Sequence, residues 1–270
     1  MHRQPNVTMK TENQFALNVS VAPKFRVLQF VLMMVPGIFA VHPVSAAVIE
    51  GWVQRYNGPW NSRDLPRAVA VDTANNVMVT GFSTAVGDYS FYTAKYAAAD
   101  GTLLWERRGP AGEVLAVDGS GDVIVVGSSW NGTNSDYYTA KYEPTKGALL
   151  WEQRYNGPQN ETDVARAVAL DTSGNVLVTG YSYSNPTNRD YYTIKYAASN
   201  GSVLWANRFD GLGNAEDSAA AIAVDQFGNV AIYTAKYAGV DGALLWGRSG
   251  PAGFKVAVDR DGNVAVAGSV

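Results

Sequence analysis

Short runs of alternating apolar and polar residues recur along the chain, separated by turns rich in Asp, Asn and Gly. Within residues 92–96, three apolar or aromatic side chains alternate with Thr93 and Lys95. A period of two predicts β-strands, because successive side chains of a strand point to opposite faces. The Gly or Asn of each turn supplies the positive φ that a tight hairpin needs. We therefore predict an all-β chain of antiparallel strands.

These segments repeat in a fixed order, and each unit is predicted to be a meander of four strands. In the first unit the strands are expected at residues 67–72, 76–81, 92–96 and 103–107. The units are placed at about 52–105, 106–151, 152–205 and 206–246, with a partial fifth unit at 247–270.

Two local expectations follow from the strand pattern. The first strand of a unit is apolar on both faces, as in residues 68–71, which predicts that both faces are covered. The fourth unit is shorter than the others between Asp225 and Trp246. We expect about one strand and its loop to be missing there.

Aromatic residues recur at fixed places in the units and are predicted to be structural, because their large rings can join one sheet to the next. They are Trp52, Trp105, Trp151, Trp205, Trp246, Tyr96, Tyr142, Tyr196 and Tyr237. The lysine of the repeated Tyr-x-Lys-Tyr pattern is expected to be solvated between packed tyrosines. Asp88, Asp136 and Asp190 are expected to start a strand or cap a turn.

Four motifs together carry a resemblance to a known repeat: Asp-Tyr-Tyr-Thr-x-Lys-Tyr, Gly-x-x-Leu-Trp, Arg-Tyr-Asn-Gly-Pro and Asp-x-x-Gly-Asn-Val-x-Val-x-Gly. Over nearly all of residues 52–270 the chain resembles the bacterial seven-bladed β-propeller (SBBP-type) repeat. It resembles more loosely the pyrroloquinoline-quinone-type propeller repeat, through residues 96–105. The resemblance implies four-stranded sheets packed radially around a channel.

The chain has about four and a half such units instead of seven. We therefore expect a β-propeller-like array that is incomplete or imperfectly closed. Three forms remain open: a strained ring, an open arc that pairs with another chain, and a gene fragment.

Residues 1–46 resemble an export leader, because basic residues precede an apolar run, 27–41, and small residues precede the bond between Ala46 and Ala47. We predict cleavage at that bond, which leaves a repeat domain at 47–270. The location is then extracellular, at the cell surface or periplasmic. A retained membrane anchor and a cytosolic protein are the alternatives.

Composition excludes several chemistries. The chain has no cysteine, and both histidines, His2 and His42, lie in the predicted leader. A mature chain without His and Cys cannot form a Ser–His–Asp triad, a Cys–His pair or an imidazole metal site. The net charge of −3 argues against nucleic acid as a partner. We predict no catalytic residue, no metal and no cofactor.

The Asp-rich hairpins invite a calcium interpretation, most of all residues 259–263. A calcium loop flanked by helices needs a bidentate acid at its twelfth position, and position 270 is Val. Hydrogen bonds from the Asp and Asn side chains within a hairpin explain these turns without a metal.

Paired carboxylates could cleave glycosides. The acidic residues that stand outside the repeat pattern are Glu113, Glu161, Asp163, Glu216 and Asp217. Each lies in or near a long connector, and we expect them to be solvated loop charges.

Trp60 and Trp130 are the candidate ligand-binding residues. Both are aromatic residues outside the repeat pattern and lie in loops, where a tryptophan can stack on a sugar or anchor a partner.

The sequence thus favours an exported, non-enzymatic repeat module that binds a polysaccharide or protein at the cell surface, or has a structural role there, with an unknown ligand. Self-association through open blade edges is expected as well. The alternatives are a quinone-dependent oxidoreductase-like or other propeller enzyme, and a fragment of a longer surface repeat protein.

Overall fold

All regular structure that the computed structural model describes is β-strand. The described residues are 15–20, 50–85, 88–210, 219–232, 235–247 and 253–268. None of these ranges contains a helix that is long and apolar enough to cross a membrane. The strands pair antiparallel throughout, which confirms the predicted all-β class.

The strands form four sheets of four strands, which we call the first to fourth blade, and two sheets of two strands. The first blade contains β3 (Asp64–Val71), β4 (Val77–Ala85), β5 (Asp88–Tyr96) and β6 (Leu103–Gly109). The second contains β7 (Val114–Val117), β8 (Val123–Trp130), β9 (Ser135–Tyr142) and β10 (Leu149–Tyr155). The third contains β11 (Val164–Leu170), β12 (Val176–Asn185), β13 (Asn188–Tyr196) and β14 (Val203–Phe209). The fourth contains β15 (Ile222–Val224), β16 (Val230–Ile232), β17 (Ala235–Tyr237) and β18 (Leu244–Gly247). The two-stranded sheets are β1 (Phe15–Ser20) with β2 (Glu50–Tyr56), and β19 (Gly253–Val258) with β20 (Val264–Gly268).

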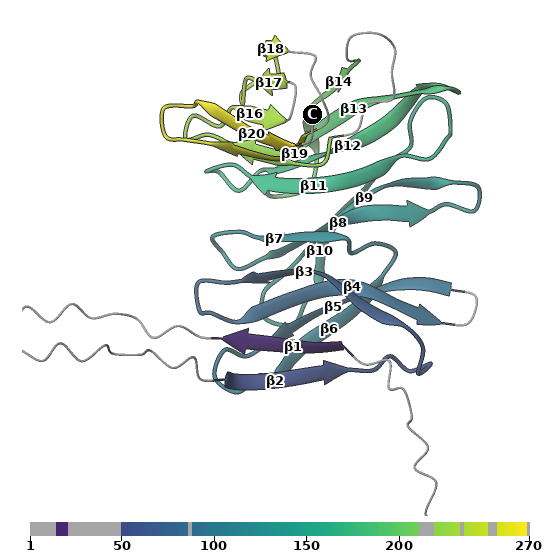
Figure 1. Ribbon diagram of the computed structural model, residues 1–270, viewed down its shortest axis with the longest axis vertical. Coiled ribbons are helices and arrows are strands. Elements are labelled where there is room, and N and C mark those ends of the chain that lie inside the picture. The colour runs from purple at the N-terminus through teal and green to yellow at the C-terminus, as the bar shows by residue number, and fades with distance from the viewer. Residues whose placement is uncertain are drawn as a thin grey trace, which may run out of the picture.

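The blades are stacked in chain order, with β1 and β2 at one end of the stack and β19 and β20 at the other (Figure 1). The first strands of successive blades lie side by side: β3 contacts β7, β7 contacts β11, and β11 contacts β15. This is the radial order of a propeller. The described residues form an array that does not close, which agrees with the expectation of an incomplete or imperfectly closed propeller.

The hydrophobic core lies between blades. Val168 and Leu170 on β11 pack against a cluster that includes Ile124 and Val126 on β8, and β11 contacts β8, so that the preceding blade covers one face of the third. Every interface buries the apolar residues of two sheets at once, which no single blade could do alone.

The first blade departs from the prediction that both faces of a first strand are covered. Val69 and Val71 on β3 are 58% and 59% exposed. The corresponding valine and leucine of β11 are covered by a full preceding blade. Among the residues that the structure describes, β1 and β2 stand ahead of β3, which is half of a blade.

The fourth blade also differs from the sequence prediction. It keeps all four strands, although β16 and β17 have only three residues each. Their pairing places Val230 opposite Tyr237 and Ile232 opposite Ala235. The missing residues therefore shorten two paired strands equally instead of removing one, which preserves the meander.

The predicted leader, 1–46, lies outside the described residues except for β1. β1 pairs with β2 as a third strand pairs with a fourth strand. Val19 stands opposite Trp52, as Lys95 stands opposite Trp105 in the first blade, and the register shifts at the next residue in both pairs. β1 also lies against β3, as β9 lies against β11. The sheet of β1 and β2 is thus half a blade.

The tryptophans of β2, β6, β10 and β14 each lie against a glycine in the next blade. Trp52, Trp105, Trp151 and Trp205 are buried and face Gly101, Gly147, Gly201 and Gly242 in the hairpins between third and fourth strands. These glycines have positive φ angles. Trp246 is less buried, at 36% exposed. Glycine is required here both by the backbone and by the ring above it.

We predict that Gly147→Ala destabilises the protein by about 2–5 kcal/mol. About 1–2 kcal/mol comes from the left-handed backbone at φ +64, and the rest from a Cβ placed 2.7 Å from ring carbon Cδ2 of Trp105. Gly228→Ala is the matched control, because Gly228 has φ +80 and no heavy atom within 4 Å of its Cβ position. Urea unfolding measures both; equal losses would show that the tryptophan contact contributes nothing.

Candidate functional site

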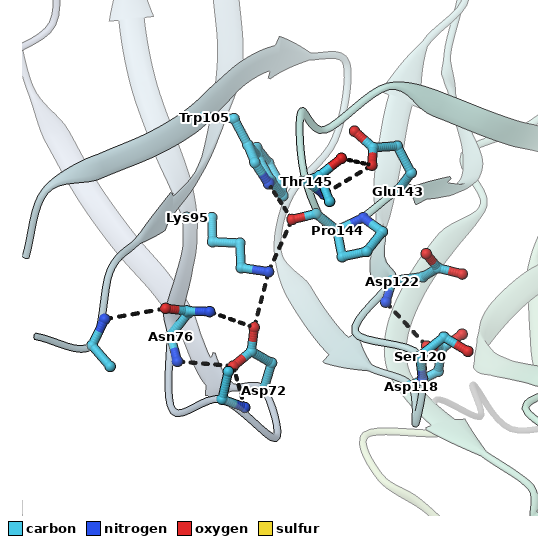
Figure 2. Close-up of polar contacts among 12 residues, drawn as sticks. Asp72, Asn76, Lys95, Trp105, Asp118, Ser120, Asp122, Glu143, Pro144 and Thr145 are labelled. Atoms are coloured by element: carbon cyan, nitrogen blue, oxygen red, sulfur yellow. Dashed lines mark hydrogen bonds and ion pairs between the residues drawn. The ribbon is translucent and has the colours of Figure 1, made fainter.

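An ion pair is buried inside each blade, between the aspartate of the first hairpin and the lysine of the third strand (Figure 2). Nζ of Lys95 lies 2.9 Å from Oδ2 of Asp72, and both side chains are almost inaccessible to water. The pair recurs as Lys141 with Asp118, Lys195 with Asp171 and Lys236 with Asp225. The expectation of solvated lysines is therefore wrong, because these side chains point into the interface with the next blade.

The same lysine also joins neighbouring blades. The carbonyl oxygen of Pro144 in the second blade accepts hydrogen bonds from Nζ of Lys95 at 2.9 Å and from Nε1 of Trp105 at 3.1 Å (Figure 2). We call this set, Asp72, Lys95, Trp105 and the carbonyl of Pro144, the latch. It recurs at the carbonyls of Ala198 and Gly239.

The pKa shifts of Asp72 and of Lys141, the equivalent lysine of the second blade, favour the charged forms. Burial raises the pKa of Asp72, but hydrogen bonds from Lys95 and Asn76 outweigh it, and the pKa lies below its usual value. Burial alone would lower the pKa of Lys141. The hydrogen bonds and negative charges of Asp118 and Asp122 have a larger effect, so that the pKa lies above its usual value. Groups held in one charge state cannot exchange protons near pH 7. The latch is therefore structural.

The hairpin aspartates hold their own turns, as predicted from sequence. Oδ1 of Asp72 accepts the backbone N–H groups of Ala74 and Asn76. Asp259 does the same for Asn263, at 2.8 Å. Among the residues that the structure describes, no three His, Cys, Asp or Glu side chains gather closely enough to hold a metal ion.

A pocket of about 480 Å³ opens where the first strands of successive blades begin. Arg67, Glu113 and Arg166 line it, each five residues before the hairpin aspartate of its blade. The fourth blade places Ala220 at this position. Three neighbouring blades thus present Arg, Glu and Arg to one cavity, with apolar walls formed by Val114, Val164 and Ala165.

A β-bulge places these residues. The pairing of β3 with β4 passes from Pro66 to Ala68 and skips Arg67, and the pairing of β11 with β12 skips Arg166 in the same way. In the second blade Glu113 donates its N–H to Val126, the residue that Val114 already opposes. A bulge turns a side chain away from the alternating pattern, here into the pocket.

Glu113 is the least solvated charge of the pocket. Burial raises its pKa, and the nearby Arg67 and Arg166 act in the opposite direction. Its Oε2 is buried and accepts no hydrogen bond. This oxygen is inaccessible to water and lies beside Gly127 of the same blade, so it belongs to the wall beneath the pocket and is not presented to a ligand.

The two loop tryptophans lie at the same end of the blades as the pocket. Trp130 is 66% exposed and is the last residue of β8. Because β7 and β8 are antiparallel, the end of β8 lies beside the start of β7. Trp60 is 60% exposed and lies in the connector that leads into β3. Both rings are available for contact.

The remaining acidic candidates differ in their exposure to water. Asp163 is buried and accepts the N–H of Gly157, as Asp64 accepts that of Gly58, so it belongs to the repeat and holds a connector. Glu161 is exposed, as expected. Glu216 and Asp217 lie outside the described residues. Asp163 and Glu113 are thus not the solvated charges that the sequence suggested.

Arg67 and Arg166 were not among the candidate residues predicted from the sequence. An arginine at the start of a strand is usually expected to be a solvated charge. Alignment of the units on the hairpin aspartate would have revealed the alternation of Arg, Glu and Arg at one position.

Comparisons with known proteins agree on the repeat. Residues 151–186 match the family model of the SBBP β-propeller repeat. The structure is similar to the crystal structure of BamB from Moraxella catarrhalis, with a TM-score of 0.52 and 17% identity, over 79% of this chain and 63% of that one. A hypothetical protein from Leishmania major matches over 70% of this chain and 89% of that one, with a TM-score of 0.26 and 10% identity. A TM-score this low does not support a shared fold. No curated protein matches.

We predict that Lys141→Met destabilises the protein by about 3–5 kcal/mol, because two buried carboxylates, Asp118 and Asp122, lose their counter-charge. Lys146→Met, at an exposed turn position, should change stability by less than about 0.5 kcal/mol. Urea unfolding of both variants is the measurement. Similar values for the two would refute the structural role of the latch.

Proposed function

For a chain built from β-propeller repeats of the SBBP type, we propose that the protein is an exported, non-enzymatic module that binds an acidic polysaccharide at the cell surface. The observation that carries this proposal is the pocket lined by Arg67, Glu113 and Arg166. Its volume of about 480 Å³ lies in the range of small-molecule sites.

The charges of the pocket favour one kind of group. Two guanidinium groups are suited to a carboxylate, which they bind through charge-assisted hydrogen bonds. A uronic acid carries a carboxylate on its sugar ring, so it supplies the group that the two arginines favour.

The exposed rings extend the surface. Trp60 and Trp130 lie at the end where the pocket opens, and the flat face of an indole packs on the apolar face of a sugar ring. A polymer whose uronic acid occupies the pocket could therefore make further contacts beyond it. The two tryptophans would add affinity, and the arginines would select acidic chains.

Export rests on the leader pattern of residues 1–46. Cleavage after Ala46 would remove β1 and leave β2 with both edges free. The pocket lies within residues 67–220 and is unaffected by that step.

We predict that the double variant Arg67→Ala/Arg166→Ala binds polygalacturonate at least about tenfold more weakly than the wild type, because two charged hydrogen bonds are lost. Isothermal titration calorimetry at fixed salt measures this. Arg55→Ala is the matched control, since Arg55 is an exposed arginine on β2 and should leave binding unchanged.

Two results would contradict the proposal. Equal binding of polygalacturonate and neutral dextran would remove the role of the carboxylate. Release of new reducing ends from the polymer by pure protein would make the module an enzyme.

We predict that the protein secreted from a bacterial host begins at Ala47, as determined by N-terminal sequencing. Ala46→Arg should accumulate as the uncut form, because leader cleavage needs a small residue there. A wild-type protein that stays in the cytoplasm with residues 1–46 attached would overturn the export proposal and leave the pocket assignment untouched.

A further inference from the structure

One negative charge stands between the two positive charges of the pocket. Arg67 comes from the first blade and Arg166 from the third, while Glu113 comes from the second blade, which lies between them. All three occupy the same position relative to the hairpin aspartate of their blades, so the radial order of the blades sets the order Arg, Glu, Arg. The charge of Glu113 therefore acts on both arginines at once.

The carboxyl group of Glu113 is folded back against β8 of its own blade. The position of a Cβ at Gly127 is only 2.5 Å from Oε2 of Glu113, so this group fills the space beside the glycine. The backbone N–H of Ser128 acts as a donor to the same carboxyl group, and Oε2 is inaccessible to water. A ligand in the cavity thus meets the guanidinium groups directly and Glu113 only through its electric field.

The charges that act on Glu113 come from two strands. β3 contributes Arg67 and β11 contributes Arg166. β4 and β8, which also contact the strand that follows Glu113, contain no titratable side chain. The other titratable residue of β3 is Asp64, whose carboxylate accepts the N–H of Gly58. The charge state of Glu113 is therefore the variable part of a site whose other charges are two guanidinium groups.

We propose that Glu113 limits the affinity of the pocket for acidic groups, and that protonation of its carboxyl group removes this limit. The ionised carboxylate lowers the positive potential that Arg67 and Arg166 create in the cavity, and the protonated group does not. The pocket then holds an acidic chain more firmly in acidic surroundings and releases it more readily at neutral pH. This inference rests on the proposed function, because it requires an acidic ligand in the pocket.

Burial of the carboxyl group moves its titration toward neutral pH. Burial raises the pKa of Glu113, and although the N–H of Ser128 and the two arginines act in the opposite direction, the pKa stays above its usual value. The arginines keep their charge over the whole range. A bound anion repels the carboxylate and raises this pKa further, so binding and protonation strengthen each other. Affinity for an acidic ligand therefore rises as the pH falls through this pKa.

Isothermal titration calorimetry of the full chain with dextran sulfate tests the proposal, because the sulfate esters stay ionised at both pH values used. At about pH 7, Glu113→Gln should bind about threefold to tenfold more tightly than the wild type, since one negative charge is lost beside the site. Between about pH 7 and about pH 5, the wild type should gain about threefold to tenfold more affinity than Glu113→Gln gains. Glu161→Gln is the matched control, because it removes the same charge from an exposed site in the connector to β11, and it should follow the wild type at both pH values.

The arginine variant separates this inference from the proposed function. If Arg67→Ala/Arg166→Ala binds as tightly as the wild type, the pocket is not the binding site and both proposals fail. If that variant binds weakly but Glu113→Gln matches the wild type at both pH values, only the role of Glu113 is wrong. A Glu161→Gln variant that behaves like Glu113→Gln also overturns the inference, because the loss of any carboxylate would then have the same effect. Circular dichroism confirms that each variant is folded.

Discussion

The structure depends on a buried lysine that cannot be satisfied within its own blade. Lys95 forms an ion pair with Asp72 of its own blade and donates a hydrogen bond to the carbonyl oxygen of Pro144 in the next blade. Removing a charge from water costs several kcal/mol unless it is paired and hydrogen-bonded, so the two blades must stay in register. The indole of Trp105 donates to the same carbonyl, and the two charged side chains are almost inaccessible to water. The blades are thus held together by the buried polar contacts of this lysine as well as by the burial of apolar side chains.

The repeat confines chemical variety to one place. Positions that hold the blades together carry the same residue types in each complete unit, because the same contact is made each time. The bulged position at the start of the first strand makes no such contact, and there the chain carries Arg67, Glu113, Arg166 and Ala220. The radial order brings these single differences into one pocket. A site can therefore arise on this fold without disturbing any interface.

Much of the architecture was readable from the sequence. Alternation and hairpin residues predicted antiparallel four-strand meanders, and the count of units predicted an array that is incomplete or imperfectly closed. The errors have a common origin: the lysine of strand three, Asp163 and Glu113 were all read as solvated charges. A sequence shows which residues are charged, but their burial depends on a neighbouring blade or connector. The shortened fourth blade was misread for a related reason, since strand pairing and not length decided which residues were lost.

The sequence by itself determined the local structure: strands, turns and the repeat, each set by residues within about ten positions of one another. Only the tertiary structure decided which charges are buried, which residues line the pocket and which apolar faces stay open. Those properties arise between residues some 50 positions apart that meet across a blade interface, such as Arg67, Glu113 and Arg166. Val69 and Val168 occupy equivalent positions in their blades, yet one faces water and the other a packed sheet. The difference is set by the neighbouring sheet, which is half a blade beside Val69 and a full blade beside Val168. The residue pattern within a single unit does not contain this information.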